Sequence, residues 1–183
     1  MDPELVLRAQ QGDEAAFAQI AQSVYRRYLQ VSYRILRDRH LAEDASQQAI
    51  VRLWQQLPRL RDPGRFDAWS YRVLSNMCLT ELERRSRRTT LPLLIDLPGQ
   101  ADEIARVSDR DQLERAFGRL TAEQRVVVVL HHHVGMTTVE VADALGIPHG
   151  TVASRLARAM SGLRQALVID RSIEPSAQRE PTR

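Results

Sequence analysis

Apolar residues recur every three or four positions along most of this chain, and that spacing limits its fold more than any other feature. Between Glu14 and Arg37 the apolar positions are Phe17, Ile20, Val24, Tyr28, Val31 and Ile35. An α-helix brings such positions onto one face, so this segment predicts a long amphipathic helix with one buried side. The 183 residues include only eight glycines and eight prolines, too few for the many tight turns of an all-β protein.

The first half predicts three more helices around this one. Asp2 followed by Pro3 begins a short helix, since aspartate caps a helix and proline fits its first turn. A third helix is predicted over 41–57 and a fourth from a capping Asp67 to about 88, with a loop over 59–65 between them. Their predicted inward residues are Ala45, Ala49, Leu53 and Leu57 in the third helix and Trp69, Val73 and Met77 in the fourth.

The second half predicts four shorter helices after an irregular segment. Over 89–110 the periodicity disappears and prolines recur, and the segment contains four acidic residues and two arginines. We interpret it as an extended linker. Two capping boxes sixteen residues apart then mark helix starts, Thr121 with Gln124 and Thr137 with Glu140. The last helix is predicted from about 149 to 167.

These segments together predict an all-α protein of two small helical modules joined by a flexible linker. A chain of this length is long enough for one ordinary domain or two very small ones. The boundaries that we expect are 1–88 for the front module, 89–110 for the linker, 111–167 for the back module and 168–183 for a polar, disordered tail.

Residues 138–160 have the pattern of a helix-turn-helix. This motif needs a small residue where its helices cross, a turn residue that tolerates positive φ, and an apolar clamp, which Ala142, Gly146 and Val152 supply. We expect its core to be completed by Val139, Leu145, Ile147 and Leu156. The second helix of the motif would present its outward side chains to base edges in the major groove. These residues are His149, Gly150, Thr151, Ser154, Arg155 and Arg158. A helical hairpin that touches no DNA is the competing interpretation.

Arginine supplies all 26 positive charges, and lysine is absent. A GC-rich genome explains that count best, so the positions of the arginines carry the argument. Residues 1–88 hold 15 arginines against 11 acids, and the segment ends in a cluster at positions 84, 85, 87 and 88. The planar guanidinium suits phosphate and guanine, which favours nucleic-acid contact over a merely solvated helix end.

The two halves together resemble the extracytoplasmic-function (ECF) sigma factors of the sigma-70 family, which keep only the second and fourth conserved sigma regions. In the front half the similarity lies in Ala42–Ala49, Leu53-Trp54, Phe66–Val73 and Asn76. In the back half it lies in Leu120–Arg125 and Ala142–Leu156. Two separate segments in the expected order are more specific than the helix-turn-helix alone.

This resemblance implies a non-enzymatic initiation factor that binds RNA polymerase core and directs promoter recognition and melting. It implies that four residues bind the clamp coiled coil of the polymerase β′ subunit, namely Asp44, Gln47, Gln48 and Arg52. A solvated helix face would look the same. It implies that a second set of residues contacts the −10 element, where a base is unstacked. These residues are Arg61, Arg65, Arg72, Asn76, Arg84, Arg85, Arg87 and Arg88. The outward residues of the second helix would read the −35 element. Contact with the β subunit and an anti-sigma partner is also implied.

The chain departs from the usual pattern of these sigma factors at four positions. Gln48 stands where glutamate is usual, and Thr80 where aspartate is common. Ala153 and Ala157 replace positions that are often basic or polar, which leaves the recognition helix with fewer phosphate contacts.

Two other functions remain open from the residues themselves. An autonomous helix-turn-helix regulator would bind a palindrome as a dimer without polymerase. A helical adaptor would bind only protein and would show no salt-dependent DNA association. The front-half motif favours the sigma factor, since a ligand-sensing domain has no reason to contain it.

The sequence predicts no enzyme, metal or cofactor. His131, His132 and His133 are consecutive, and neighbouring helical residues point about 100° apart, so they would not converge on one ion. Cys78 has no second cysteine and is expected to be buried and inert. We expect a cytoplasmic protein, because there is no signal peptide and no apolar run long enough to cross a membrane.

Overall fold

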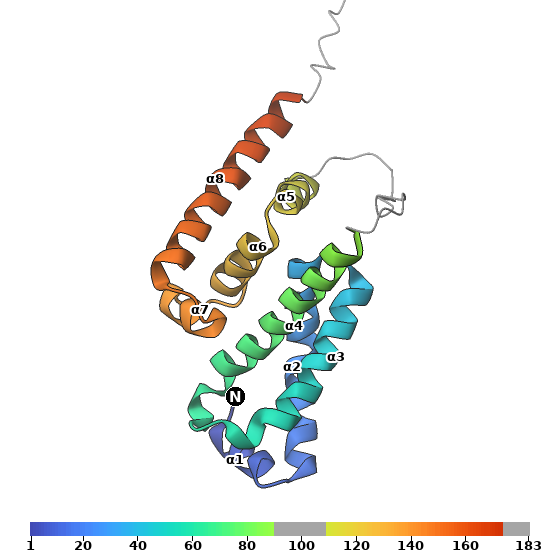
Figure 1. Cartoon of the computed structure of the whole chain (residues 1–183), viewed down its shortest axis with the longest axis vertical. Helices are drawn as coiled ribbons and strands as arrows, with labels where there is room; N and C mark the ends of the chain where they lie inside the picture. The colour runs from blue at the N-terminus through green and yellow to red at the C-terminus, as the bar shows by residue number, and fades with distance from the viewer. Residues whose placement is uncertain (90–108, 174–183) are drawn as a thin grey trace, which may run out of the picture.

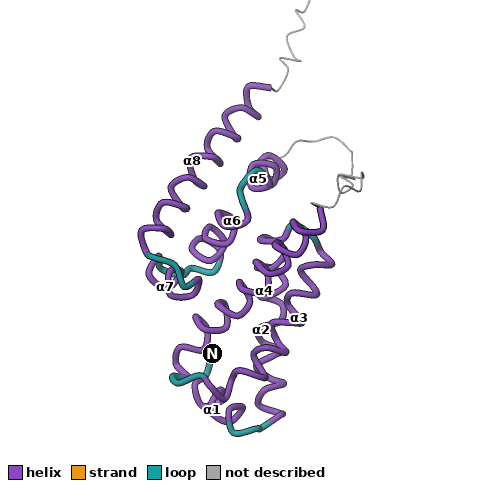
Figure 2. Tube along the Cα trace, in the orientation of Figure 1, coloured by secondary structure: helices purple, strands orange, loops and turns teal. Residues whose placement is uncertain are grey.

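The computed structural model describes residues 1–89 and 109–173, over which the all-α prediction is confirmed (Figure 1, Figure 2). The front module contains α1 (Pro3–Gln10), α2 (Glu14–Leu36), α3 (Arg39–Gln56) and α4 (Phe66–Thr89), with short turns η1 (Leu57–Arg59) and η2 (Pro63–Arg65) before α4. The back module contains α5 (Asp109–Gly118), α6 (Ala122–Val128), the π-helical turn η3 (Val129–His133), α7 (Thr138–Leu145) and α8 (His149–Ile173). None of the helices in the described ranges is long and apolar enough to span a membrane.

Helix α2 packs against α1, α3 and α4, and the stripe predicted from its periodicity faces the core. Its apolar stripe is buried except for Phe17, which is half-buried. Helix α3 packs on α2 through small residues, Ala42, Ala45 and Ala49, which let the two backbones approach closely. The predicted inward residues of α3 and α4 are all buried or half-buried.

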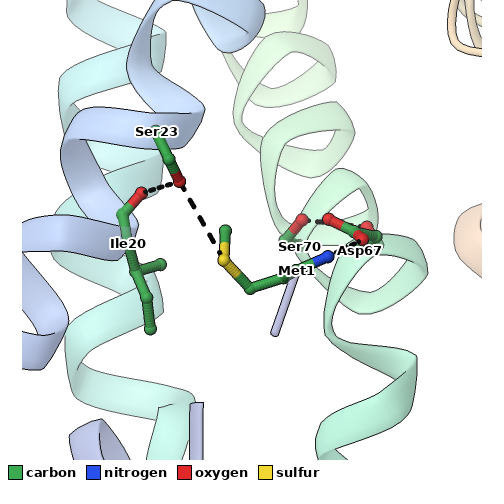
Figure 3. Close-up of polar contacts among 5 residues, drawn as sticks. All are labelled: Met1, Ile20, Ser23, Asp67 and Ser70. Atoms are coloured by element: carbon green, nitrogen blue, oxygen red, sulfur yellow. Dashed lines mark hydrogen bonds and ion pairs between the residues drawn. The ribbon is translucent and has the colours of Figure 1, made fainter. Parts of the chain in front are cut away.

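The start of α4 differs from the prediction. The helix begins at Phe66, after η2, whose own cap is the carboxylate of Asp62 accepting from Gly64 N at 2.9 Å. Asp67 therefore lies inside the first turn, and its carboxylate accepts from the Met1 amine at 2.7 Å (Figure 3). A carboxylate in the first turn still complements the helix dipole, which is why the sequence pattern resembled a cap.

The back module begins its helices where the capping boxes predict. In both boxes the threonine hydroxyl accepts from the backbone N–H three residues later, and the Gln124 or Glu140 side chain accepts in return. Gly146 ends α7 with φ of 65°, the left-handed conformation that glycine adopts without strain.

The last helix is longer than predicted. It continues to Ile173, six residues past the expected end, and no proline lies between 149 and 173 to interrupt it. The rest of the predicted tail, 174–183, and most of the predicted linker, 90–108, lie outside the described residues.

The two modules share one hydrophobic core. Five consecutive residues, Val126–Leu130, are buried, so this segment is covered on every side. Val128 faces the back module's own cluster, beside Leu120 and Leu163. The other four join the cluster that contains the front-module residues, and α4 also packs against α7.

Candidate functional site

The outer face of α3 carries the polar residues that the sequence assigned to polymerase binding. Asp44, Gln47, Gln48 and Arg52 are all exposed, while Ala45, Ala49 and Leu53 on the opposite face are buried. The inward Ser46 is satisfied locally, since its hydroxyl donates to the Ala42 carbonyl oxygen at 2.6 Å. The helix thus presents a polar surface to solvent, and the Ser46 hydroxyl on its buried face is paired within the helix.

Sequence reasoning missed an apolar part of this face. Val51 is 56% exposed and Trp54 is 38% exposed, and both border a shallow groove completed by Glu14, Phe17 and Ile50. The Phe17 and Trp54 rings lie 4.7 Å apart between centroids, so the floor of the groove is aromatic. The signal was present in the spacing, because positions 47, 51 and 54 share one helical face.

The −10 candidates whose side chains the structure describes, on α4 and in the segment before it, are exposed but do not form one surface. Arg72 and Asn76 are exposed one turn apart, on the same side of α4. Arg85 lies on a different side, where its guanidinium is 3.7 Å from the Asp38 carboxylate at the start of α3. Arg61 and Arg65 are exposed in the segment before α4, with Arg65 3.7 Å from Asp62.

The other arginines at the end of α4 are Arg84, Arg87 and Arg88. Arg84 is 3.5 Å from the Glu81 carboxylate, one turn earlier on the same helix. Arg87 and Arg88 fall on the last turn of α4, and their side chains lie outside the described part of the chain.

The helix-turn-helix is formed by α7 and α8. Ala142 and Val152 are buried, and Leu145, Ile147 and Leu156 pack partly buried against them, as predicted. Val139 is wrong as a core residue: it is 57% exposed. It is the second residue of α7 and lies about 160° around this helix from the buried Val141, so its side chain points to the solvent side.

The outer face of α8 is made of small residues flanked by polar ones. Gly150, Ala153 and Ala157 are exposed along one line of the helix, with Arg158 exposed at its edge. Thr151 and Ser154 are half-buried, and the Ser154 hydroxyl donates to the Thr151 carbonyl oxygen at 3.0 Å. The face can therefore approach a partner closely.

His149 and Arg155 are both held by the neighbouring helices. His149 Nε2 lies 2.8 Å from the Thr138 hydroxyl, which ties the start of α8 to the start of α7. The expectation that Arg155 projects outward is wrong. Its side chain is 23% exposed and its Nη2 lies 2.7 Å from the Glu123 carboxylate on α6. The reason is rotational, since Arg155 is about 140° around the helix from Gly150 and next to the buried face.

The three histidines occupy the last three positions of η3. His131 Nδ1 lies 2.7 Å from the Met136 carbonyl oxygen, and its ring is 4.7 Å from that of His132. Partial burial, with Arg34 nearby, lowers the pKa of His133. His131 and His132 therefore contact each other, whereas the charged neighbour of His133 is Arg34.

Cys78 is buried in the front module, as the sequence predicts. Its thiol is 3.5 Å from the Ser32 hydroxyl, and burial raises its pKa to about 11. A thiol this basic is almost entirely protonated at neutral pH and is a poor nucleophile.

Comparison with known proteins divides the chain at the same place as the fold. The family model described as "Sigma-70 region 2" matches residues 20–88, which hold most of α2, all of α3 and all of α4 except its last residue. The model described as "Sigma-70, region 4" matches residues 110–163, which include the helix-turn-helix.

Whole-chain comparisons agree. The ECF RNA polymerase sigma factor SigM of Mycobacterium tuberculosis is 32% identical over 166 residues, covering 91% of this chain and 84% of that protein. The solved structure of CnrH in complex with the cytosolic domain of CnrY has a TM-score of 0.68 at 26% identity, covering 92% of this chain and 98% of CnrH. The sigma factor RpoE from Bartonella quintana, solved with the anti-sigma factor NepR, has a TM-score of 0.69 at 22% identity and covers 84% and 98%.

Proposed function

Because the chain belongs to the ECF sigma factors of the sigma-70 family, we propose that it binds RNA polymerase core through α3 and directs the holoenzyme to promoters through α4 and α8. The observation that carries this proposal is the presence, in one chain, of an exposed polar and apolar face on α3 and an exposed helix-turn-helix face on α8. The first fits a protein partner, and the second fits a DNA groove.

The polymerase contact is assigned to one face of α3. Asp44, Gln47, Gln48 and Arg52 supply polar contacts, and we add Val51 and Trp54 as the apolar part. Protein interfaces place a buried apolar anchor inside a polar rim, and the exposed Trp54 edge above Phe17 has that character. The expected partner is the clamp coiled coil of the β′ subunit.

The −10 contact is assigned to η2 and α4. Arg72 and Asn76 form the exposed side that would meet unstacked bases and backbone, with Arg61 and Arg65 at its start. Arg84, Arg87 and Arg88 extend it as phosphate contacts. Arg85 would join them only by leaving Asp38.

The −35 contact is assigned to the small-residue face of α8 and its edges. Gly150, Thr151, Ser154 and Arg158 can approach base edges and phosphates directly. His149 contributes from the first turn. Arg155 takes part only when Glu123 releases it, so its role is conditional in a way that the sequence did not suggest.

We further propose that the protein acts in the cytoplasm, is not an enzyme, and has an anti-sigma protein as a partner. The cytoplasm is the proposed compartment because RNA polymerase core and promoter DNA, the proposed partners, are located there. The similarity to CnrH, which was solved with a protein partner, supports the third point. The division proposed for the chain follows 1–88, 89–110 and 111–167, with the end of the back module moved to 173.

The test is run-off transcription with purified protein and sigma-free bacterial core polymerase on fragmented GC-rich genomic DNA. We expect discrete transcripts whose starts share upstream motifs. If no transcript appears and the protein fails to co-migrate with core, the proposal is wrong. Footprints with two-fold symmetry in the absence of polymerase would instead support the autonomous regulator.

A further inference from the structure

The segment between α3 and α4, residues 57–65, carries two of the −10 candidates, Arg61 and Arg65, on irregular backbone. This 57–65 loop contains η1 and η2, each closed by a backbone hydrogen bond of 3.0 Å. Neither of these two bonds involves the peptide group between Leu60 and Arg61. Since short 3₁₀ turns have poorer hydrogen-bond geometry than an α-helix, the loop depends on contacts outside itself to keep one shape.

The side chain of Gln10 supplies such a contact. Gln10 is the last residue of α1, and its Nε2 donates to two carbonyl oxygens of the 57–65 loop, that of Leu60 at 2.7 Å and that of Leu57 at 3.0 Å. A primary amide has two N–H donors, so one side chain satisfies both acceptors. The Leu60 carbonyl belongs to the planar peptide group that precedes Arg61, so its bond to Gln10 fixes the orientation of that group.

Helix α1 is anchored in the core of the front module. Val6 and Ala9 are buried and belong to the cluster that contains the stripe of α2. Arg8 Nη2 donates to the Asp13 carboxylate at 2.6 Å, which ties the last turn of α1 to the start of α2. Figure 1 shows α1 beside the turns that join α3 to α4, and it contacts both η1 and η2. Gln10 therefore holds the 57–65 loop from a fixed position.

Binding of unstacked, single-stranded DNA is favoured by a loop that is ordered beforehand. Ordering a flexible loop costs free energy at the moment of binding, and a loop held by the rest of the fold avoids that cost. Gln10 is half-buried with its amide bonded to the loop, whereas Arg61 and Arg65 are exposed. The match to the sigma-70 region 2 model begins at residue 20, so it assigns no role to Gln10. Gln10 acts on the shape of the loop and leaves the DNA contact to the arginines.

We propose that Gln10 is a positioning residue for the −10 contact. Through the Leu57 and Leu60 carbonyl oxygens it orders the 57–65 loop, so that Arg61 and Arg65 meet single-stranded DNA in one arrangement. The part that concerns DNA rests on the proposed function, whereas the ordering of the loop does not. A glutamine that only stabilised the front module would affect every contact of that module alike, and this difference is what the experiment measures.

The experiment compares the same substitution at two neighbouring positions of the full chain. Gln10→Met keeps the length of the side chain and removes both N–H donors, and Gln11→Met is the matched control at an exposed residue. Amide hydrogen exchange of the free protein, followed by mass spectrometry of peptides covering 57–65, measures the order of the loop. Affinity is measured for polymerase core and then, with the holoenzyme, for two DNA probes. These are a −35 duplex and a single-stranded non-template −10 oligonucleotide, both from a promoter located by the run-off test.

We expect Gln10→Met to speed hydrogen exchange in the 57–65 loop and to weaken binding of the −10 oligonucleotide by about five- to tenfold, as loss of two hydrogen bonds allows. Its affinities for core and for the −35 duplex should equal those of wild type. Gln11→Met should match wild type in all four measurements. Gln10→Glu should weaken −10 binding at least as much as Gln10→Met, because its carboxylate has no donor and repels the two carbonyl oxygens.

Unchanged exchange in Gln10→Met would overturn the proposal, and so would faster exchange with unchanged −10 binding. Equal weakening of core, −35 and −10 binding would assign Gln10 to the stability of the front module, which thermal unfolding of each variant checks, and would also overturn it. If the protein forms no holoenzyme and yields no run-off transcript, the proposed function is wrong and the role at DNA is wrong with it. The exchange measurement still decides, in that case, whether Gln10 orders the loop.

Discussion

Glu123 on α6 and Arg155 on α8 form a 2.7 Å ion pair that holds the arginine of the recognition helix beside the back module's own core. The carboxylate is 61% exposed and the guanidinium 23%. The pair therefore adds little to stability, typically under about 1 kcal/mol for exposed pairs. Its larger effect is on where the arginine can reach.

The first prediction concerns release of this arginine. Glu123→Gln should let Arg155 reach a phosphate, so holoenzyme binding to −35 DNA should tighten several-fold. The slope of log K against log salt should steepen by about 0.9, the value for one additional phosphate contact. The measurement is a salt titration of promoter binding by fluorescence anisotropy.

Asp143→Asn supplies the control for that titration, because it removes an exposed carboxylate from α7 of the same module. If both variants shift binding equally, the effect is one of net charge and Arg155 gains no contact. Weaker binding by Glu123→Gln would mean that the ion pair itself positions the recognition helix.

The second prediction concerns Val51. Val51→Glu places a charge in the apolar part of the α3 face and should weaken core polymerase binding by at least about tenfold. Because the side chain is 56% exposed, the free energy of unfolding should change by less than about 0.5 kcal/mol. Surface-immobilised core and urea unfolding measure the two quantities.

Leu7→Glu is the comparison for this variant, since Leu7 is an exposed leucine of α1, 46% exposed, that does not border the groove. It should bind core as wild type does. Equal loss in both variants would show that added negative charge on the front module, and not the α3 face, is responsible.

The third prediction concerns the buried thiol. Cys78 should react with a thiol-specific reagent at pH 8 only as fast as the front module opens or unfolds. Its pKa is raised from the usual 9.0 to about 11, so the unfolded chain loses this proton first as the pH rises. The stabilisation is therefore complete below about pH 9 and is lost between about pH 9 and 11.

Labelling kinetics with and without urea test the first part of this prediction. Urea unfolding of wild type and Cys78→Ala at pH 7 and pH 10 tests the second. The difference in unfolding free energy between the two proteins should be smaller at pH 10, and an unchanged difference would contradict the assigned burial.

The fourth prediction concerns the turn of the helix-turn-helix. Gly146 has φ of 65°, and a Cβ there would meet no atom within 4 Å, so only backbone strain opposes substitution. Gly146→Val should destabilise the protein by about 2 kcal/mol, and Gly146→Asn by less than about 1, since asparagine tolerates this conformation. Chemical unfolding gives both values, and equal effects would argue against strain as the cause.

Structural features that depend on residues close together along the chain could be predicted from the sequence. The stripe along α2, the two capping boxes and the glycine at 146 each depend on interactions within a few residues, and all are present as predicted. The error at Asp67 has the same origin. Capping and a long-range bond to the Met1 amine use the same carboxylate, and spacing alone does not distinguish them.

The sequence by itself determined the helices, their buried faces and the order of two sigma regions, because periodicity and capping are local properties. Only the tertiary structure decided that Val51 and Trp54 form an apolar groove with Phe17, that Glu123 holds Arg155, and that Arg37 and Arg125 join the modules. These contacts join residues 32 to 90 positions apart along the chain. Their formation depends on how helices pack in space, which no local pattern encodes.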